Sequence, residues 1–217
     1  MQTVFITGGT GYIGTRLINA LLDDGNYHVK ALIRKGSKNK LPEGCEIIYA
    51  DALDADTYKN SIAPATIFVH LIGVAHPSPT KAEQFKKIDL VSVQQAAKAA
   101  ATAGVKHFIY LSVAMYPTKI MKDYQAVRAE GESILLQQNF VCSFIRPWYV
   151  LGPGHWWPLL LKPFYWLAKC IPSKREAAKQ LGTVTIKQII KTLLFAIKNQ
   201  PQGNTVYDVS KIKTLNF

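Results

Sequence analysis

With 217 residues, 48% of them hydrophobic, the chain is long enough to bury one sizeable core, so we expect a compact protein without a large second domain. The formal net charge is +12, but 21 of the 26 basic residues are lysines. Specific nucleic-acid recognition favours the forked hydrogen bonds of arginine, so we expect no nucleic-acid partner. The three cysteines lack metal-ligand spacing, and neither a leader peptide nor an uncharged membrane span is apparent, which favours a cytoplasmic location.

Apolar, β-branched segments alternate with helical patterns over the first two thirds of the chain. Strands are expected over residues 3–7, 28–34, 46–50, 66–72, 107–112 and 141–146, with helices over 12–22, up to Gly104 and around 118–138. The strands are largely apolar throughout rather than at alternate positions, which is typical of a parallel sheet covered on both faces. The pattern predicts an α/β fold built on a Rossmann-type, doubly wound parallel sheet.

The first strand and the first helix are joined by the sequence TGGTGYIG, residues 7–14. Gly8 permits a tight turn, Gly11 lets the backbone approach a pyrophosphate, and Gly14 lets the helix pack closely against the strand. Main-chain N–H groups at a helix N-terminus then face the anion. We predict that this turn binds the phosphates of a cofactor through Gly8, Thr10, Gly11, Tyr12, Ile13 and Gly14. A tight turn without a ligand is the alternative.

The end of the second strand indicates which dinucleotide is bound. NAD sites usually carry Asp or Glu there, about 20 residues beyond the turn, to bind the ribose 2′-hydroxyl. This chain has ALIRKGSK instead, and Arg34 is placed to bind a 2′-phosphate, so NADP(H) is favoured over NAD(H). Asp51 and Ala52 follow the third strand and are assigned to the cofactor site. Asp51 would either contact the adenine or cap a helix beginning at Ala55.

The segment DYQAVR, residues 123–128, places a phenol and a cation four positions apart. Tyr124 and Arg128 therefore share a helix face. They would form either a proton-transfer pair or only an exposed pair on the helix surface. The first interpretation is favoured because the segment follows the fifth strand, at the edge where a nicotinamide would lie.

Taken together, these motifs resemble those of the atypical short-chain dehydrogenase/reductase family, compact NAD(P)H-binding proteins related to NAD-dependent epimerases and dehydratases. The likeness covers residues 1–154 and rests on TGGTGYIG, ALIR, YADALD, HLIG, AAKAAATAGVKHFIYLS, YQAVRAEGE and FIRPWYVLGPG. It implies that Leu71, Ile72 and Gly73 line the cofactor after the fourth strand, and that the loop beginning at Pro147 lies beside the nicotinamide. A looser similarity is to the dinucleotide-binding accessory subunit of respiratory complex I.

The resemblance also implies a catalytic helix, and the chain departs from the family pattern there. The family has Tyr-x-x-x-Lys, in which the tyrosine transfers a proton and the lysine supports it, whereas Arg128 stands here in place of the lysine. The family offers Ser or Thr after the fifth strand, whereas Val113 occupies that position and Ser112 lies one residue earlier. Because neighbouring strand residues point to opposite faces, Ser112 is expected to replace the missing hydroxyl only if the strand end bends.

After Pro147 the chain changes character. Residues 148–171 hold seven aromatic residues with two lysines among them, and residues 162–217 carry a net charge of +8. The segment would pack in the core, form a lid over an apolar substrate, or bind a protein partner or membrane surface through residues 155–170. His155 would be a pocket acid or a structural hydrogen-bonding residue, and His70 and His76 do not indicate a metal site.

We predict a dinucleotide-binding core over residues 1–154 and, in the same domain, a small C-terminal substrate or lid portion over 155–217. That portion is expected to hold a helix over about 186–199 and a strand over 205–209. The predicted function is an NADP(H)-binding oxidoreductase that acts on a small, apolar carbonyl or enol compound, with Tyr124 as proton donor, Arg128 in support and Ser112 as the nearest hydroxyl. The alternative is a cofactor-binding sensor or accessory subunit without turnover, associated with a membrane or a larger complex.

Overall fold

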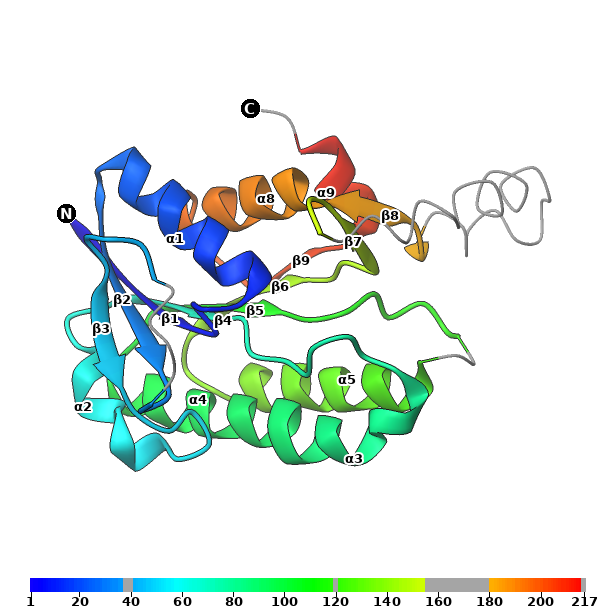
Figure 1. The fold of residues 1–217 in the computed structure, drawn as a ribbon, viewed down its shortest axis with the longest axis horizontal. Coiled ribbons are helices and arrows are strands. Elements are labelled where there is room, and N and C mark those ends of the chain that lie inside the picture. Colours follow the sequence, from blue (N-terminus) through cyan, green and yellow to red (C-terminus); the bar gives the residue numbers. More distant parts are fainter. Residues whose placement is uncertain (37–40, 119–120, 155–179, 216–217) are drawn as a thin grey trace.

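The computed structural model describes residues 1–36, 41–118, 121–154 and 180–215. Among these residues, seven parallel strands form one sheet in the order β3-β2-β1-β4-β5-β6-β9 (Figure 1). The order reverses at β1, and doubly wound sheets bind ligands at such a switch point, beyond the carboxyl ends of the strands. The predicted Rossmann-type fold is therefore confirmed. The strands are β1 (Gln2–Thr7), β2 (Tyr27–Ile33), β3 (Glu46–Tyr49), β4 (Ile67–His70), β5 (His107–Leu111), β6 (Val141–Ile145) and β9 (Thr205–Tyr207).

Helices cover both faces of the sheet (Figure 1). One face carries α1 (Tyr12–Asp24), α8 (Ile186–Lys198) and α9 (Val209–Thr214), and the other carries α2 (Lys59–Ile62), α4 (Val91–Thr102) and α5 (Lys122–Leu136). Each face has its own apolar cluster, with Leu17 and Leu193 in the first and Ala97 and Leu135 in the second. Because both faces are buried, the strands are apolar throughout, as predicted.

The helix expected before Gly104 contains a wide turn. The short helices η2 (Pro79–Lys81) and α3 (Ala82–Gln84) lead into a π-helix, η3 (Phe85–Leu90), which continues directly into α4. A π-helix adds a residue to the turn and so changes which side chains share a face. Asp89, in η3, is fully buried. Gly104 follows α4 with a φ of 73°, the left-handed conformation that commonly ends helices.

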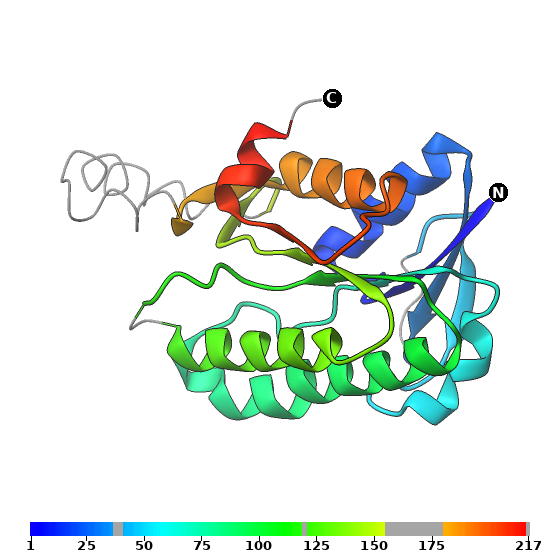
Figure 2. The same ribbon diagram turned by 180° about the vertical axis from the view of Figure 1, so that it is seen from behind.

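The described part of the C-terminal region belongs to the core. β9 pairs with β6 at the edge of the sheet, and α8 packs against α1, as Figure 2 shows from behind. A separate parallel pair, β7 (Tyr149–Leu151) with β8 (Thr183–Thr185), precedes α8. The predicted helix near 186–199 and strand near 205 are therefore confirmed, whereas the pairing of β7 with β8 was not expected.

Helix α5 approaches β5 closely at one glycine. A Cβ atom added to Gly131 would lie 2.9 Å from the Oη atom of Tyr110 and 3.0 Å from the Cγ1 atom of Val93. Tyr110 and Val93 are fully buried, so neither side chain has open space to move into. A side chain at position 131 would therefore push apart the junction of α4, α5 and β5.

Replacing Gly131 with alanine is expected to lower the free energy of unfolding by about 1–3 kcal/mol, because the added methyl group overpacks this junction. That loss outweighs the roughly 1 kcal/mol by which alanine favours a helix over glycine. Gly203→Ala is the control, since a Cβ atom added there meets nothing within 4 Å. Urea unfolding measures both variants, and an unchanged stability of Gly131→Ala would show that α5 moves freely away from Tyr110.

Candidate functional site

The turn after β1 has the geometry of an anion-binding site. Gly8 has a φ of 78°, and its carbonyl oxygen accepts a hydrogen bond from the Gly11 N–H group at 3.0 Å. Gly11 begins α1 without a side-chain cap, and the first turn of the helix holds no acidic residue. N–H groups at the start of a helix lack intrahelical acceptors and attract anions. Thr10, Tyr12 and Ile13 complete the turn, so the predicted phosphate-binding residues lie together.

Three backbone segments meet at this turn, which explains its glycines. A Cβ atom on Gly8 would lie 2.8 Å from the carbonyl carbon of Leu71, which follows β4. A Cβ atom on Gly14 would overlap the carbonyl oxygen of Gly8 and lie 2.8 Å from the Cα atom of Gly9. The N–H group of Leu71 also donates to the carbonyl oxygen of Thr7 at 3.0 Å. Glycine at positions 8 and 14 therefore lets the ends of β1 and β4 and the start of α1 pack together.

Arg34 lies at the same edge of the sheet as the turn. Leu32 pairs with Thr7 in the ladder between β2 and β1, so Arg34, two residues later, follows the end of β2 next to the turn. Its side chain is exposed. Lys35 and Gly36 come next, and no carboxylate lies among these three residues. A guanidinium rather than a carboxylate therefore stands where a ribose 2′-substituent would be recognised.

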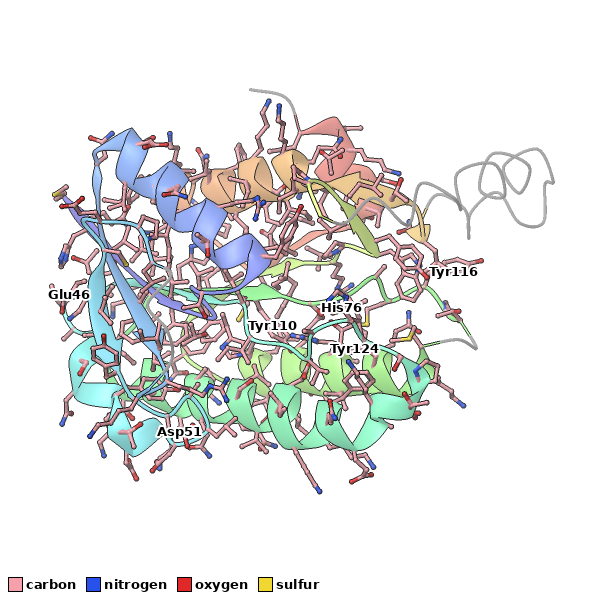
Figure 3. The ribbon with its side chains drawn as sticks, in the orientation of Figure 1. Glu46, Asp51, His76, Tyr110, Tyr116 and Tyr124 are labelled. Carbon is pink, nitrogen blue, oxygen red and sulfur yellow. The ribbon has the colours of Figure 1, made fainter. Side chains whose placement is uncertain are left out.

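Asp51 lies after β3 and makes a local turn. Its Oδ1 atom accepts a hydrogen bond from the Leu53 N–H group at 2.9 Å. The short helix η1 (Ala55–Thr57) is capped by Asp54, whose Oδ1 atom accepts from the main chain two residues on at 3.1 Å. The capping role considered for Asp51 therefore belongs to Asp54. Asp51 is exposed beside the buried Ala52, below the end of the sheet in Figure 3, and its contact with an adenine stays a prediction.

Arg128 is buried rather than exposed on the surface of α5. Its side chain is 4% exposed, and its Nη2 atom lies 2.6 Å from the Oδ1 atom of Asp89. Nη1 donates to the Oη atom of Tyr110 at 3.2 Å and to the carbonyl oxygen of Leu111 at 3.0 Å. Nη2 donates to the carbonyl oxygen of Ile72 at 3.3 Å. The interpretation of an exposed helix pair is therefore wrong, because the guanidinium joins α5 to η3 and to the ends of β4 and β5.

The charges in this buried cluster compensate one another. Burial raises the pKa of the Asp89 carboxyl group, and the adjacent guanidinium opposes that rise. Burial by itself lowers the pKa of Arg128, but Tyr110, Tyr124 and Asp89 raise it, so the guanidinium stays protonated. Removing one partner of such a buried pair costs about 3–5 kcal/mol, because the other charge is left uncompensated.

Tyr124 lies at the margin of this cluster and is partly exposed. Its ring packs against Phe85 with the ring centres 4.9 Å apart, and the Cζ atom of Arg128 lies 5.2 Å from the centre of the Tyr124 ring. Tyr124 and Tyr110 both lie between the sheet and α5 (Figure 3). The i, i+4 spacing thus brings Tyr124 and Arg128 together, as predicted, with the cation against the ring.

Ser112 continues the alternation of β5. The even-numbered residues of β5 belong to the apolar cluster on the α5 face, and Ile109 belongs to the cluster on the α1 face. The ladder extends one residue further, since the Ser112 N–H group donates to the carbonyl oxygen of Ile145 at 2.7 Å. By alternation Ser112 follows Tyr110 on the α5 side. Ala114, also even-numbered, belongs to the cluster on the α1 face, so the alternation is broken between Ser112 and Ala114. The role of Ser112 as the replacement hydroxyl stays a prediction. Among the described residues, the buried Oγ atom of Ser112 has no hydrogen-bond partner.

A chain of buried hydrogen bonds links the Arg128 cluster to the phosphate turn. The Oγ atom of Ser92 donates to the carbonyl oxygen of Asp89 at 3.0 Å and lies 3.2 Å from the Nε2 atom of His70. The Nδ1 atom of His70 lies 2.8 Å from the Oγ1 atom of Thr7, which directly precedes the turn. Burial, together with the charge of Arg128, lowers the pKa of His70 to about 3. The imidazole is therefore neutral and acts as a structural link between β1 and β4.

The loops after β5 and β6 are held together beside α5. The Nε2 atom of Gln125 donates to the carbonyl oxygens of Ala114 at 2.6 Å and Tyr116 at 2.8 Å. The N–H group of Ala114 donates to the carbonyl oxygen of the buried Pro147 at 2.9 Å. Pro147 thus lies at the predicted edge of the sheet. The proposals for residues 155–170, including His155, fall outside the described residues.

Membrane-spanning helices and metal-binding clusters are both absent from the part of the chain that the structure describes. It contains no helix that is both long enough and apolar enough to span a bilayer. It also contains no group of three or more His, Cys, Asp or Glu side chains that could hold a metal ion.

Asp89 is the residue of the candidate site that the sequence did not reveal, together with its neighbours Ser92 and Tyr110. One signal was present: a single carboxylate in the apolar helical segment IDLVSV, residues 88–93. A buried carboxylate requires a cation or hydrogen-bond donors. That rule predicts a partner for Asp89 but does not say that the partner is Arg128, which follows 39 residues later.

A sequence model of a family described as NAD(P)H-binding matches residues 8–147 of the chain. A 4-hydroxy-2-methyl-3-oxo-4-farnesyl-3,4-dihydroquinoline-1-oxide ketoreductase of Stigmatella aurantiaca is 24% identical over 169 residues, which cover 68% of this chain and 50% of the relative. An uncharacterized sugar epimerase of Bacillus subtilis, YhfK, is 25% identical over 218 aligned residues, which cover 96% of this chain and 94% of the relative. The chain spans about half the length of the first curated relatives that it matches.

Solved structures show the same fold. UDP-glucuronic acid 4-epimerase from Bacillus cereus, in complex with NAD, superposes with a TM-score of 0.69 at 17% sequence identity, over 95% of this chain and 78% of that chain. At this level of identity the likeness shows the fold alone.

The two buried histidines predict acid sensitivity. Burial lowers the pKa of His70 to about 3 and that of His107 to about 4, so the folded protein binds fewer protons than the unfolded chain below pH 6.5. Stability is therefore present above pH 6.5 and is lost as the pH falls toward 4, by up to about 1.4 kcal/mol per pH unit for each histidine. Urea unfolding at pH 7, 6 and 5 measures this slope. His107→Gln should remove the contribution of one histidine, and an unchanged slope would contradict the assignment.

Proposed function

Because the chain belongs to the NAD(P)H-binding family, we propose that it is an NADP(H)-dependent oxidoreductase acting on a small, apolar carbonyl or enol compound. One observation carries the proposal. The carboxyl edge of the sheet holds an anion-binding turn after β1, an exposed Arg34 after β2, and Tyr124 with Ser112 on the α5 side of β5. A dinucleotide bound across the switch point would place its adenosine end at Arg34 and its nicotinamide end at Tyr124 and Ser112.

The preference for NADP(H) rests on Arg34. Its fork of donors suits a 2′-phosphate, and the residues after β2 offer no carboxylate for a 2′-hydroxyl. Asp51, on the next strand, already accepts a hydrogen bond from Leu53. Leu71, Ile72 and Gly73 would line the cofactor beyond the turn, and Pro147 would lie near its nicotinamide end.

The proton donor in this proposal is Tyr124. When bound, the reduced nicotinamide supplies the hydride to the substrate carbon. The Oη atom of Tyr124 gives its proton to the substrate oxygen, and the guanidinium of Arg128 lies beside the Tyr124 ring, with its Cζ atom 5.2 Å from the ring centre. Ser112 would donate a hydrogen bond to the same oxygen, because its Oγ atom has no partner among the described residues. The substrate carbonyl then becomes an alcohol.

An apolar substrate is supported by the surroundings of Tyr124. Phe85 packs against its ring, and Val113 stands beside Ser112. The relative from Stigmatella aurantiaca is named as a ketoreductase of a 3-oxo compound that carries a farnesyl group. These features favour a carbonyl on a hydrophobic skeleton over a charged sugar nucleotide.

The second candidate is a cofactor-binding sensor or accessory protein without turnover. The Asp89–Arg128 pair favours it, because the Nη1 and Nη2 atoms of the guanidinium are already engaged by Asp89, Tyr110, Leu111 and Ile72. A cation engaged in this way contacts a ribose less readily than a free lysine ammonium would.

Arg34→Ala is expected to weaken NADPH binding by about tenfold or more, because hydrogen bonds to a charged group contribute about 1.5–3 kcal/mol. NADH has no 2′-phosphate, so its affinity should stay the same within about twofold. Lys35→Ala is the matched control, since it removes a neighbouring exposed charge. Isothermal titration calorimetry with both coenzymes measures the difference. An equal loss for NADPH and NADH would count against a contact between Arg34 and the 2′-phosphate.

Tyr124→Phe is expected to lower the rate of NADPH oxidation by about 10²- to 10⁴-fold, the range for loss of a general acid. NADPH affinity should be unchanged, because only the hydroxyl is removed. The assay follows NADPH absorbance with a panel of aldehydes, ketones and quinones, and Tyr116→Phe serves as control because its carbonyl bond to Gln125 survives. Tight NADPH binding by the wild type with no oxidation of any compound would favour the second candidate.

A further inference from the structure

The Asp89–Arg128 pair has a feature that proton transfer does not explain: both partners hold the same short stretch of main chain. Nη2 of Arg128 donates to the carbonyl oxygen of Ile72 at 3.3 Å, and Oδ2 of Asp89 accepts from the N–H group of Val74 at 3.0 Å. These two contacts lie on either side of Gly73. The segment that follows β4 is thus fastened on both sides of one glycine by a single ion pair.

Gly73 is part of this arrangement. A Cβ atom there would overlap the guanidinium of Arg128 and lie 3.3 Å from Oδ1 of Asp89. The absence of a side chain therefore lets the ion pair approach the backbone directly. Among the described residues, the last ladder bond of this segment is the one from Leu71 to Thr7 of β1, because β4 ends at His70. Beyond it, Ile72 and Val74 are held by the ion pair.

We propose that the Asp89–Arg128 pair is a positioning device for the nicotinamide half of the cofactor, acting through the main chain on both sides of Gly73. The proposal rests on the proposed cofactor binding. Arg128 is then a positioning residue rather than a catalytic one, because it is 3% exposed and its two terminal nitrogens already have acceptors. The adenosine half, near the turn and Arg34, lies outside its direct reach.

The position of Asp89 is itself tightly held. The π-helix η3 carries it, and its main-chain carbonyl oxygen is bonded to Ser92, which is linked through His70 to Thr7 at the end of β1. Nη1 of Arg128 donates hydrogen bonds to the Oη atom of Tyr110 and to the carbonyl oxygen of Leu111. Through these hydrogen bonds, the pair connects the Ile72–Val74 segment to β1, β5 and α5. A wall fixed in this way is preorganised for a ligand.

Two conservative variants and one double variant test the device. Asp89→Asn keeps an acceptor for Arg128, but its amide nitrogen cannot accept from Val74. Arg128→Lys keeps the charge, but a compact ammonium cannot satisfy the acceptors that the planar fork spans. Asp89→Leu combined with Arg128→Met removes both charges, and replacing a whole buried pair by apolar residues often leaves stability unchanged. The double variant therefore gives a folded protein without the device.

The measurement is the affinity for NADPH and for 2′,5′-ADP, which carries the adenosine half alone, by titration calorimetry of protein shown to be folded by urea unfolding. The variants are expected to bind NADPH about tenfold or more weakly and 2′,5′-ADP within about twofold of wild type. Lys30→Met is the control for general damage, since Lys30 is 7% exposed and bonds to Ala63 before β4, at the opposite edge of the sheet. It should leave both affinities unchanged.

Equal losses for NADPH and 2′,5′-ADP, or no loss for either, would overturn the positioning role while leaving the proposed cofactor binding intact. A wild-type protein that binds neither compound would overturn the proposed function, and the positioning role with it. The difference between the two ligands is the result that a merely structural role would not produce, because a general loss of stability does not distinguish one half of the cofactor from the other.

Discussion

The close meeting of three backbone segments after β1 is the constraint on which the rest of the site depends. Gly8 touches the main chain of Leu71, and Gly14 touches that of Gly8 and Gly9, so α1 begins directly above the gap between β1 and β4. This contact brings the positive end of α1 to the switch point of the sheet. The register of β2 against β1 then sets the position of Arg34 at this edge. The end of β4, paired with β1, sets the position of the Ile72–Val74 segment.

The second organising feature is electrostatic. Thr7, His70, Ser92, Asp89 and Arg128 form a continuous buried polar path from the phosphate turn to the helix that carries Tyr124. Burying an ion pair contributes little net stability, since desolvation offsets the attraction. What the pair does supply is a specific geometry, because each charge tolerates only an arrangement that satisfies it. The polar path therefore joins the turn proposed to bind the diphosphate to the helix that carries Tyr124.

The features predicted from the sequence are those that depend on local pattern. The strand, glycine turn and first helix follow one another along the chain, and the i, i+4 spacing alone brings Tyr124 to Arg128. The position of Arg34 needed only the end of a strand to be recognised. In each case the physical cause lies within about 20 residues of sequence, as it does for a βα unit.

The features that were missed depend on distant contacts or on a change of helical phase. Asp89 lies in a π-helix, and no pattern of apolar residues reveals that turn. Its partner Arg128 lies 39 residues further along the chain, so the sequence left open an exposed position for Arg128 as the alternative to the favoured proton-transfer pair. The face on which Ser112 lies could not be fixed from the sequence, because the end of β5 could not be located to one residue and a shift of one residue reverses the face. The pairing of β7 with β8 joins segments about thirty residues apart and leaves no local trace.

The central claim is that the main-chain amides after β1 hold the diphosphate of a nicotinamide coenzyme. The most direct test is a calorimetric titration of the wild-type protein with NADPH, repeated in the presence of excess 2′,5′-ADP, on a sample with a cooperative urea transition. The account predicts saturable binding at one site, displaced by the adenosine half. A folded protein that shows no measurable affinity for NADPH or NADH would contradict it.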